Sequence, residues 1–289
     1  MEQILVNGLY LGAQYALIAL GLTLIFSLMN VLNFAHGQMY VLGGFVTYTI
    51  VSQLGLPFIV GLIGSAVTLA VVGAMIEKFL FRPVIRRSHR EESTMLLAAG
   101  IAFFLDAVIL LLFGEKQRGV PKIINGVFNW DFRIIMPYDR ILIGVLAIAM
   151  IAAFILFMQY SRAGRAMRAL AQDRVAAQLM GVDVDRYSMI GFALGAMLAG
   201  LVGGLLVTIT GVNLGMGGPT SIKAFMMIMI GGAGVISGAI AGGFILGMME
   251  SIGLTVLAAY GDITYLVIFA SLMVFLAIRP QGLMGKPWG

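Results

Sequence analysis

The chain contains no cysteine and very little charge. Charged residues make up 11% of its 289 positions, while hydrophobic residues make up 61% and the mean hydropathy is +1.03. Soluble domains are about 45–50% apolar and about 25% charged, so this composition excludes an ordinary soluble domain. The lack of cysteine excludes disulfides and thiolate metal sites. With only two histidines besides, we expect no metal site.

Long stretches of the chain carry no charge at all. Asp, Glu, Lys and Arg are absent from residues 3–76, 141–161, 187–222, 224–249 and 263–278. A membrane-spanning helix needs about 20 apolar residues, so the first of these runs holds about three spans. We therefore predict an all-α polytopic membrane protein, with residues 1–289 forming a single transmembrane domain.

The predicted spans alternate with loops whose charges set their side of the membrane. Spans are expected near 4–29, 31–54, 57–81, 94–113, 138–158, 187–210 and 262–278, with two shorter or broken spans in 221–260. This makes about eight to ten crossings, nine in the simplest topology, some of them broken or re-entrant. The positive-inside rule places loops 82–93 and 161–186 in the cytoplasm, together with the tail that carries Arg279 and Lys286. Loop 114–137 and the N-terminus then lie outside, and the C-terminus lies inside.

The net charge of +5 comes from basic residues in loops beside the spans, so it does not indicate a nucleic-acid partner. Residues 1–3 lack the positive region that begins a cleaved secretory signal, so the first apolar helix is expected to be a true span. Glycines four positions apart, such as Gly8 and Gly12 or Gly243 and Gly247, predict close packing between helices.

The segment 161–186, SRAGRAMRALAQDRVAAQLMGVDVDR, is polar although it lies between two predicted spans. Ala163, Met167 and Leu170 are spaced to form one apolar helical stripe, beside a face that carries Arg162, Arg165 and Arg168. This pattern predicts a short amphipathic helix along the cytoplasmic surface. Such a helix either anchors to anionic lipid head groups or inserts into a groove on a soluble partner.

Polar side chains interrupt the apolar sequence at Asn33, His36 and Gln38. Polar groups inside a bilayer are tolerated where a helix breaks or lines a cavity. Two interpretations remain open: an unwound segment that lines a substrate pathway, and a surface loop between the first two spans.

A second interruption, Gly211–Ser221, is rich in glycine and contains Pro219, which breaks a helix. It is either a re-entrant segment, with Asn213 on the pathway, or a plain external loop. Thr220 or Ser221 is expected to cap the next helix. Lys223 then either extends to the membrane interface or contacts a substrate carboxylate.

Two carboxylates, Asp106 and Glu250, stand within apolar runs. An ionisable group inside a membrane is a functional hypothesis by default. Asp106 is expected to pair with a basic residue of another helix, and Glu250 to lie at the membrane interface if it is not functional.

Five short segments, in order along the chain, carry a family resemblance. They are Tyr15–Gly21 (YALIALG), Asn33–Gly37 (NFAHG), Ser161–Ala169 (SRAGRAMRA), Lys223–Phe225 (KAF) and Arg279–Gly285 (RPQGLMG). Together they resemble the permease family of branched-chain amino acid ABC importers, the LivH type. Ala176-Ala177-x-x-x-Gly181 is also similar to the core of the coupling loop in ABC importer permeases, although Val175 stands where that loop usually has Glu.

The resemblance implies a second homologous permease subunit, two cytoplasmic ATPase subunits, an extracytoplasmic amino-acid-binding protein, and a place in the bacterial inner membrane. ATP and Mg would be bound by the ATPase subunits, so no cofactor is expected on this chain. The coupling residues implied are Arg162, Gly164, Arg165, Arg168, Asp173, Ala176, Ala177 and Gly181. The pathway residues expected are Asn33, His36, Gln38, Asn213 and Lys223, and no catalytic residue is expected.

Other classes of function are less compatible with the residues present. The chain has no GxxxxGK[ST] pattern, so ATP hydrolysis must come from another subunit. An ATP-independent carrier usually has carboxylates near the membrane midplane, and residues 3–76 have none. An intramembrane enzyme needs a nucleophile with a base or a metal cluster, and no such pattern is present. Related permeases carry urea, short amides or other amino acids, so the substrate stays open.

Overall fold

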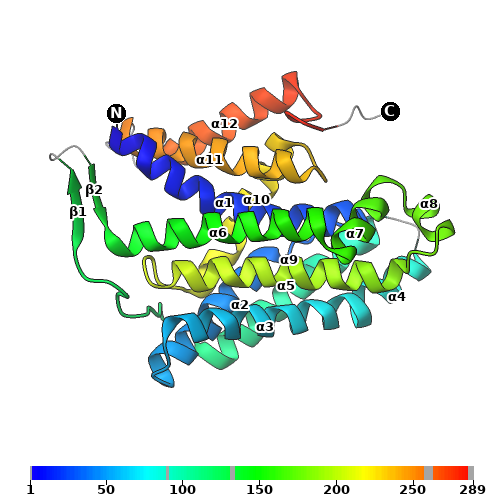
Figure 1. Cartoon of the computed structure of the whole chain (residues 1–289), viewed down its shortest axis with the longest axis horizontal. Helices are drawn as coiled ribbons and strands as arrows, with labels where there is room; N and C mark the ends of the chain where they lie inside the picture. The colour runs from blue at the N-terminus through cyan, green and yellow to red at the C-terminus, as the bar shows by residue number, and fades with distance from the viewer. Residues whose placement is uncertain (1, 89–90, 131–133, 257–262, 286–289) are drawn as a thin grey trace.

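Helices occupy the charge-free runs in the structure, a computed structural model that describes residues 2–88, 91–130, 134–256 and 263–285 (Figure 1). The α-helices are α1 (Glu2–Met29), α2 (His36–Tyr48), α3 (Phe58–Ile76), α4 (Arg82–Arg87), α5 (Glu91–Phe113), α6 (Tyr138–Tyr160), α7 (Arg162–Gln172), α8 (Arg174–Leu179), α9 (Val184–Leu206), α10 (Gly217–Gly231), α11 (Ile236–Val256) and α12 (Ile263–Ile278). Thr49–Gln53 and Glu77–Phe81 are π-helical, and Leu214–Met216 is a 3₁₀ turn.

The predicted all-α, polytopic class is confirmed. In the described part of the chain, 6 helical segments are long and apolar enough to cross a membrane. They are Glu2–Met29, Phe58–Arg87, Glu92–Phe113, Tyr138–Tyr160, Val184–Leu206 and Ile236–Val256. The α2, α10 and α12 helices are shorter, and the two helices expected within 221–260 are α10 and α11.

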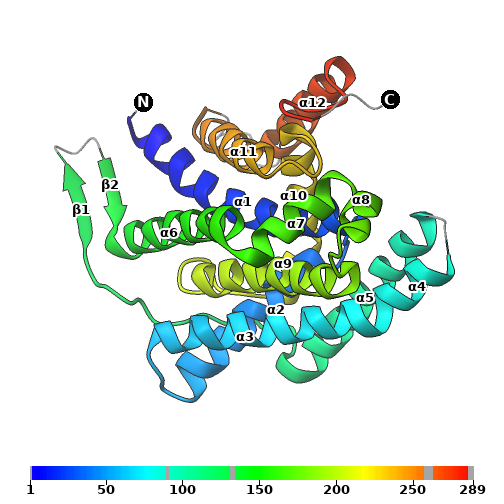
Figure 2. The same ribbon diagram turned by 45° about the vertical axis from the view of Figure 1, so that its right-hand side comes forward.

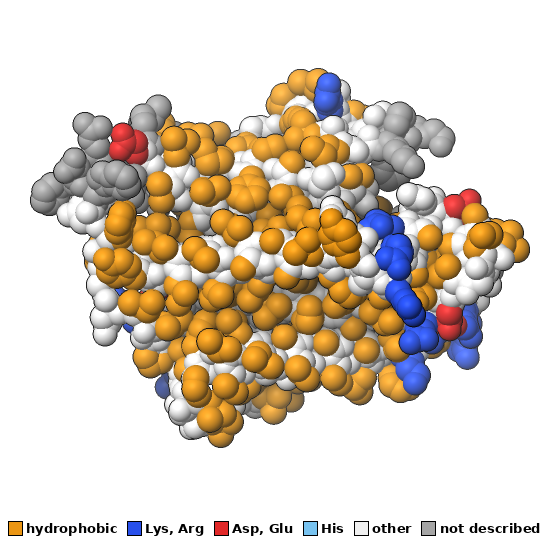
Figure 3. All heavy atoms as spheres, viewed as in Figure 1, with side chains coloured by type: hydrophobic (Ala, Val, Ile, Leu, Met, Phe, Trp, Pro, Cys, Tyr) orange, Lys and Arg blue, Asp and Glu red, His pale blue; other side chains and the backbone are white. Residues whose placement is uncertain are grey.

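The bundle is built in layers around α1. In the most apolar window of α1, 83% of the residues are buried, against 22% for α5, so α1 is central and α5 peripheral. The central helix packs on α9, α10 and α11, while α9 also packs on α2 and α3. Large apolar side chains cover the outside of the bundle, as expected of a surface that faces lipid (Figure 3).

Glycine permits the closest helix crossings, as its spacing predicted. An added Cβ at Gly243 of α11 would lie 2.4 Å from the backbone nitrogen of Ala16, and one at Gly247 would lie 2.4 Å from that of Gly12. The α1 and α11 backbones therefore touch without intervening side chains, which is the packing mode of small residues in membrane helices.

The two ends of the bundle differ. The N-terminus and the β hairpin lie at one end, while α4, α7 and α8 lie at the other (Figures 1 and 2). Lys and Arg side chains gather at the α7–α8 end of the face seen in Figure 3, whereas apolar side chains cover most of that face. The charged segments 82–88 and 161–186, predicted on one side of the membrane, therefore share one end of the bundle. Lys286 of the tail lies outside the described residues.

Several predicted boundaries were wrong. Residues 82–87 form α4 instead of a loop, and they continue the helix from α3 through the π-helical turn Glu77–Phe81. The charges there mark the end of the apolar region, while the helix itself extends beyond it. The span expected from residue 31 begins at His36, because Asn30 adopts a left-handed conformation (φ 53°) that ends α1.

Two further features were not anticipated. The segment expected to be a plain loop at 114–137 contains an antiparallel hairpin of β1 (Val127–Trp130) and β2 (Ile134–Pro137), in which Val127 pairs with Pro137. The α10 helix begins at Gly217, so Thr220 and Ser221 lie inside its first turns and do not cap it.

Candidate functional site

A half-open cavity of about 590 Å³ lies among the helices, in the half towards the N-terminal end of α1. Small-molecule sites commonly measure about 300–1,000 Å³, so its size suits a small solute. Its lining comes from α1, α2, the end of α9, the α9–α10 break, α10 and α11: Leu11, Gln14, Tyr15, Ile18, Tyr40, Leu206, Thr210, Asn213, Gly215, Met216, Pro219, Thr220, Lys223 and Glu250. A smaller cavity of about 220 Å³ shares Leu11, Gln14, Leu206 and Thr210 with it. This second cavity continues to Asn7, so the two extend towards the end of the bundle opposite α7 and α8.

An ion pair with a tyrosine lies in the wall of the larger cavity. Lys223 Nζ donates to Glu250 Oε1 at 2.8 Å and to Tyr15 Oη at 2.8 Å. Tyr15 Oη in turn donates to Glu250 Oε2 at 2.5 Å. Three helices thus bring one cation, one anion and one hydroxyl together, with the Glu250 side chain 7% exposed and that of Lys223 25% exposed.

The expected pathway residues divide into two groups. Asn213 and Lys223 line the cavity, whereas Asn33, His36 and Gln38 are not among the described residues that do so. These three are buried in the packing between helices, so the surface-loop interpretation of this segment is wrong. Their part in transport stays a prediction.

The buried turn before α2 is held by its polar groups. Asn33 Oδ1 accepts a hydrogen bond from the Ala35 backbone nitrogen at 3.1 Å, and His36 Nε2 lies 3.1 Å from the Ile18 carbonyl of α1. Ser221 Oγ donates to the Phe34 carbonyl and accepts from the Gly37 nitrogen, which joins the starts of α2 and α10. These side chains therefore fix the position of α10, which carries Lys223 to the cavity.

The two isolated carboxylates have different surroundings. Asp106 of α5 has Gln38 of α2 as a polar neighbour, a neutral side chain where a basic one was expected. Glu250 is 5% exposed and lies between helices, so it is not on the outer surface of the bundle. Lys223 and Glu250 were treated separately in the sequence analysis. The signal that links them is that they are opposite charges at the two ends of the uncharged run 224–249.

Segment 161–186, for which a coupling role is predicted, forms two short helices and the start of a third, each with a side-chain cap. Ser161 Oγ accepts from the Gly164 nitrogen at 2.8 Å, Asp173 Oδ1 from the Ala176 nitrogen at 2.9 Å, and Asp183 Oδ1 from the Arg186 nitrogen at 3.0 Å. Met167 and Leu170 are buried, as the apolar stripe predicted. Gly181 ends the α8 turn with a φ of +85°, which favours glycine.

Two arginines of α7 bind the preceding helix. Arg165 Nη1 donates to the Tyr160 carbonyl at 2.8 Å, and Arg168 Nη1 donates to the Met158 carbonyl. The last carbonyls of a helix lack partners within it and carry partial negative charge, so both contacts stabilise the end of α6. Arg162 is exposed, as is Ala176, whereas Ala177 is buried.

We expect Arg165→Glu to lower the uptake rate, because a carboxylate at this position repels the α6 carbonyls and releases α7. The loss of stability should be about 1–2 kcal/mol, the scale of a charge-assisted contact at a helix end. Arg165→Lys keeps the positive charge and serves as the control in a transport assay with membrane levels measured in parallel. Wild-type uptake by Arg165→Glu would show that this contact does not position α7.

The outer surface of α8 is apolar although it projects from the charged end of the molecule. Val175 is 68% exposed, Leu179 83% and Met180 85%. Clustered exposed apolar side chains on an otherwise polar surface mark an interaction site. We name Val175, Leu179 and Met180 the α8 tip.

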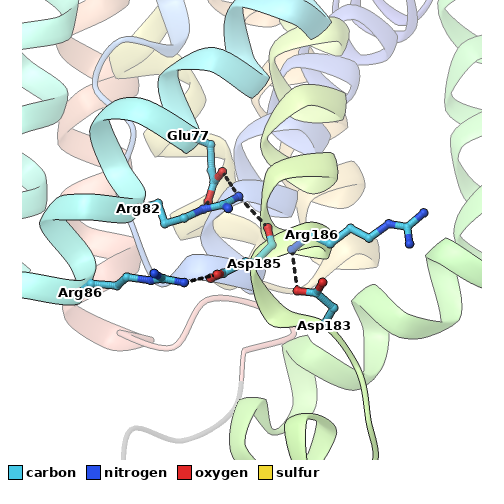
Figure 4. A network of polar contacts seen from close by, with 6 residues as sticks. All are labelled: Glu77, Arg82, Arg86, Asp183, Asp185 and Arg186. Atoms are coloured by element: carbon cyan, nitrogen blue, oxygen red, sulfur yellow. Dashed lines mark hydrogen bonds and ion pairs between the residues drawn. The ribbon is translucent and has the colours of Figure 1, made fainter.

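A polar network joins α4 to the start of α9 (Figure 4). Arg82 forms an ion pair with Glu77 at 2.7 Å and also donates to the Asp185 carbonyl at 3.0 Å. Arg86 pairs with the Asp185 carboxylate. The network joins the start of α9, the helix that follows segment 161–186, to the α3–α4 end.

A bundle of membrane-length helices, a half-open cavity with paired charges and a projecting apolar helix tip together indicate a membrane permease. A family model described as "Branched-chain amino acid transport system / permease component" matches residues 4–276. The chain therefore belongs to this permease family.

Two relatives and one solved structure give the extent of the similarity. The high-affinity branched-chain amino acid transport system permease protein LivH of Escherichia coli (strain K12) is 33% identical, over 97% of this chain and 94% of its own length. The corresponding protein BraD of Pseudomonas aeruginosa is 33% identical, over 99% and 96%. The structure of PsaBC from Streptococcus pneumoniae in complex with Fab matches with a TM-score of 0.51 at 16% identity, covering 95% of this chain and 90% of that one, which is a likeness of fold.

Proposed function

We propose that this chain is the permease subunit of an ABC importer and forms half of the translocation pathway for branched-chain amino acids. The observation that carries the choice of solute is the cavity of about 590 Å³. Its wall combines aliphatic side chains, such as Leu11 and Ile18, with the Lys223–Glu250 pair. A branched-chain amino acid has the same combination of an aliphatic group and two opposite charges.

The power for transport comes from other subunits in this proposal. The chain has no phosphate-binding GxxxxGK[ST] pattern, so ATP and Mg are bound by two cytoplasmic ATPase subunits that dock at the α8 tip. A second homologous permease completes the pathway, and an extracytoplasmic binding protein delivers the amino acid to the opposite end. The assembly lies in the bacterial inner membrane, with lipid around α3 and α5 and with the coupling segment and the C-terminus in the cytoplasm.

The charged cavity supports an amino acid over the alternative substrates. Urea and short amides carry no net or separated charge. A Lys–Glu pair in the wall therefore binds them little more strongly than water does. An ATP-independent carrier is disfavoured as well, because the protruding apolar α8 tip has no role in a protein that works without a docked partner.

The experiment is leucine uptake by proteoliposomes that contain the permease and its partner subunits. We expect an ATPase subunit to copurify, and leucine to enter only when ATP and the binding protein are both supplied. Urea and acetamide serve as competitors and should not reduce the rate. Leucine flux without ATP, or purification without any ATPase, would contradict the proposal and favour a carrier.

A further inference from the structure

We propose that Lys223, Glu250 and Tyr15 form the site that recognises the charged head of an α-amino acid zwitterion. In this arrangement Lys223 faces the substrate carboxylate and Glu250 faces the substrate ammonium. The inference rests on the proposed function, because it names the residues by which the cavity would select an amino acid.

The first argument is the position of the pair. Lys223 and Glu250 each lie next to a charge-free run, because residues 187–222 and 224–249 carry no charge. The α10 and α11 helices nevertheless bring Lys223 Nζ to 2.8 Å from Glu250 Oε1. A buried ion pair loses much of its hydration, and apolar residues of similar volume often replace such a pair without loss of stability. Both charges line the cavity and are not sealed between helices, so the pair is placed to meet a solute.

The second argument is charge balance. A zwitterion placed head to tail beside the pair puts each substrate charge next to its opposite, and the net charge of the cavity stays zero. A substrate with only one charge would leave an uncompensated charge in a low-dielectric site, where the cost is high. The pair therefore predicts discrimination against leucine analogues that lack either the ammonium or the carboxylate.

Gln14 provides independent support. It is 1% exposed, it lines both cavities, and its Nε2 has no hydrogen-bond partner among the described residues. Buried polar groups without partners are uncommon and call for an explanation such as a missing ligand. An amide donor beside Tyr15 suits a carboxylate oxygen. The aliphatic walls at Leu11, Ile18 and Leu206 then accommodate the substrate side chain.

The test compares single and double neutral variants in the complete transporter. Lys223→Met, Glu250→Gln and the double variant Lys223→Met/Glu250→Gln are reconstituted with the partner subunits, and the initial rate of leucine uptake is measured. Each single variant should lose about 30-fold or more, the scale expected when a partner of a buried charge is removed. The double variant should lose a similar factor, because neither charge of the substrate then has its partner. The double variant should still bind the ATPase subunits, because it leaves no unpaired charge.

The double variant separates recognition from a purely structural role. If the pair only held α10 to α11, neutralising both charges would restore uptake, and near wild-type uptake by the double variant would overturn the proposal. Ile222→Met combined with Ile252→Met is the matched control, since these neighbouring side chains are 48% and 47% exposed and are not among the residues that line the cavity. This control should transport leucine at the wild-type rate.

A second measurement keeps the charges intact and so does not depend on the stability of the variants. The chain has no cysteine, so Thr220→Cys places one reporter thiol in the cavity wall. Leucine should slow maleimide labelling of this thiol, whereas 4-methylpentanoate and isopentylamine should not. Equal protection by either analogue would overturn the proposal.

The failure of this inference can be told apart from failure of the proposed function. If the wild-type complex does not take up leucine with ATP and binding protein, the function itself is wrong. If the wild-type complex and the double neutral variant both take up leucine, the function stands and only the recognition site is wrong.

Discussion

Replacing Gly203 by leucine is expected to abolish the folded permease. Gly203 lies on α9 where that helix crosses α2, and an added Cβ would come within 1.9 Å of the Tyr40 carbonyl oxygen and 2.9 Å of the Gly44 nitrogen. Both are backbone atoms, so no side chain can move aside to relieve the clash. Overpacking a core costs about 1–3 kcal/mol when side chains can adjust, and here two central helices must separate instead.

The measurement is the amount of monodisperse protein recovered from membranes, with the midpoint of thermal unfolding for whatever remains. Gly100→Leu is the matched control, because Gly100 lies on the exposed side of α5 and an added Cβ there meets nothing within 4 Å. The control should be recovered like the wild type, since leucine also favours the helix over glycine by up to about 1 kcal/mol. Equal recovery of Gly203→Leu would mean that α2 and α9 do not approach as closely as the structure has them.

The fold class and the helix breaks could be predicted because they follow from local properties of the chain. A long run without charge can only be stable in a membrane as a helix, and a cluster of glycine with proline interrupts that helix. The interruption at Gly211–Ser221 is therefore visible in the sequence, and the structure breaks the helix there. Helix ends were less predictable at α4, because arginines indicate where the membrane ends, and a helix is free to continue into water.

The candidate cavity could be predicted only in part, because its chemistry depends on residues far apart in the chain. Lys223 and Tyr15 are 208 positions apart, and Lys223 and Glu250 are 27 apart. Their meeting is set by the α1–α11 glycine crossing and by the join of α2 to α10, neither of which a local pattern specifies. The same limit applies to His36: a polar residue in an apolar run indicates burial, but not which buried partner it has, so its part in the pathway stays a prediction.

Replacing Leu179 and Met180 together by aspartate is expected to abolish ATPase docking, and with it uptake, while leaving the permease folded. Both side chains are more than 80% exposed, at 83% and 85%, so their loss removes little packing within the chain. Exposed substitutions usually change stability by less than about 0.5 kcal/mol each. If the α8 tip inserts into an apolar groove of the ATPase, two buried carboxylates there have no partner, and the desolvation cost opposes binding. Copurification of the ATPase subunit and ATP-dependent leucine uptake are the two readouts.

The control exchanges the same two side chains, Leu179→Met with Met180→Leu, which keeps the tip apolar and should preserve both docking and uptake. The alternative interpretation of segment 161–186 as a lipid anchor gives a different result, because an anchor depends on its arginines more than on α8. In that case the double aspartate variant would keep its ATPase and its transport, whereas Arg162→Ala would weaken membrane attachment of α7. A variant that binds the ATPase but does not transport would mean that the α8 tip transmits movement and that other surfaces dock the ATPase.

The path for that movement is short, since Asp183 caps α9 and Asp185 joins α9 to Arg86. A displacement of the α8 tip therefore reaches α9, which packs on α1 beside the cavity.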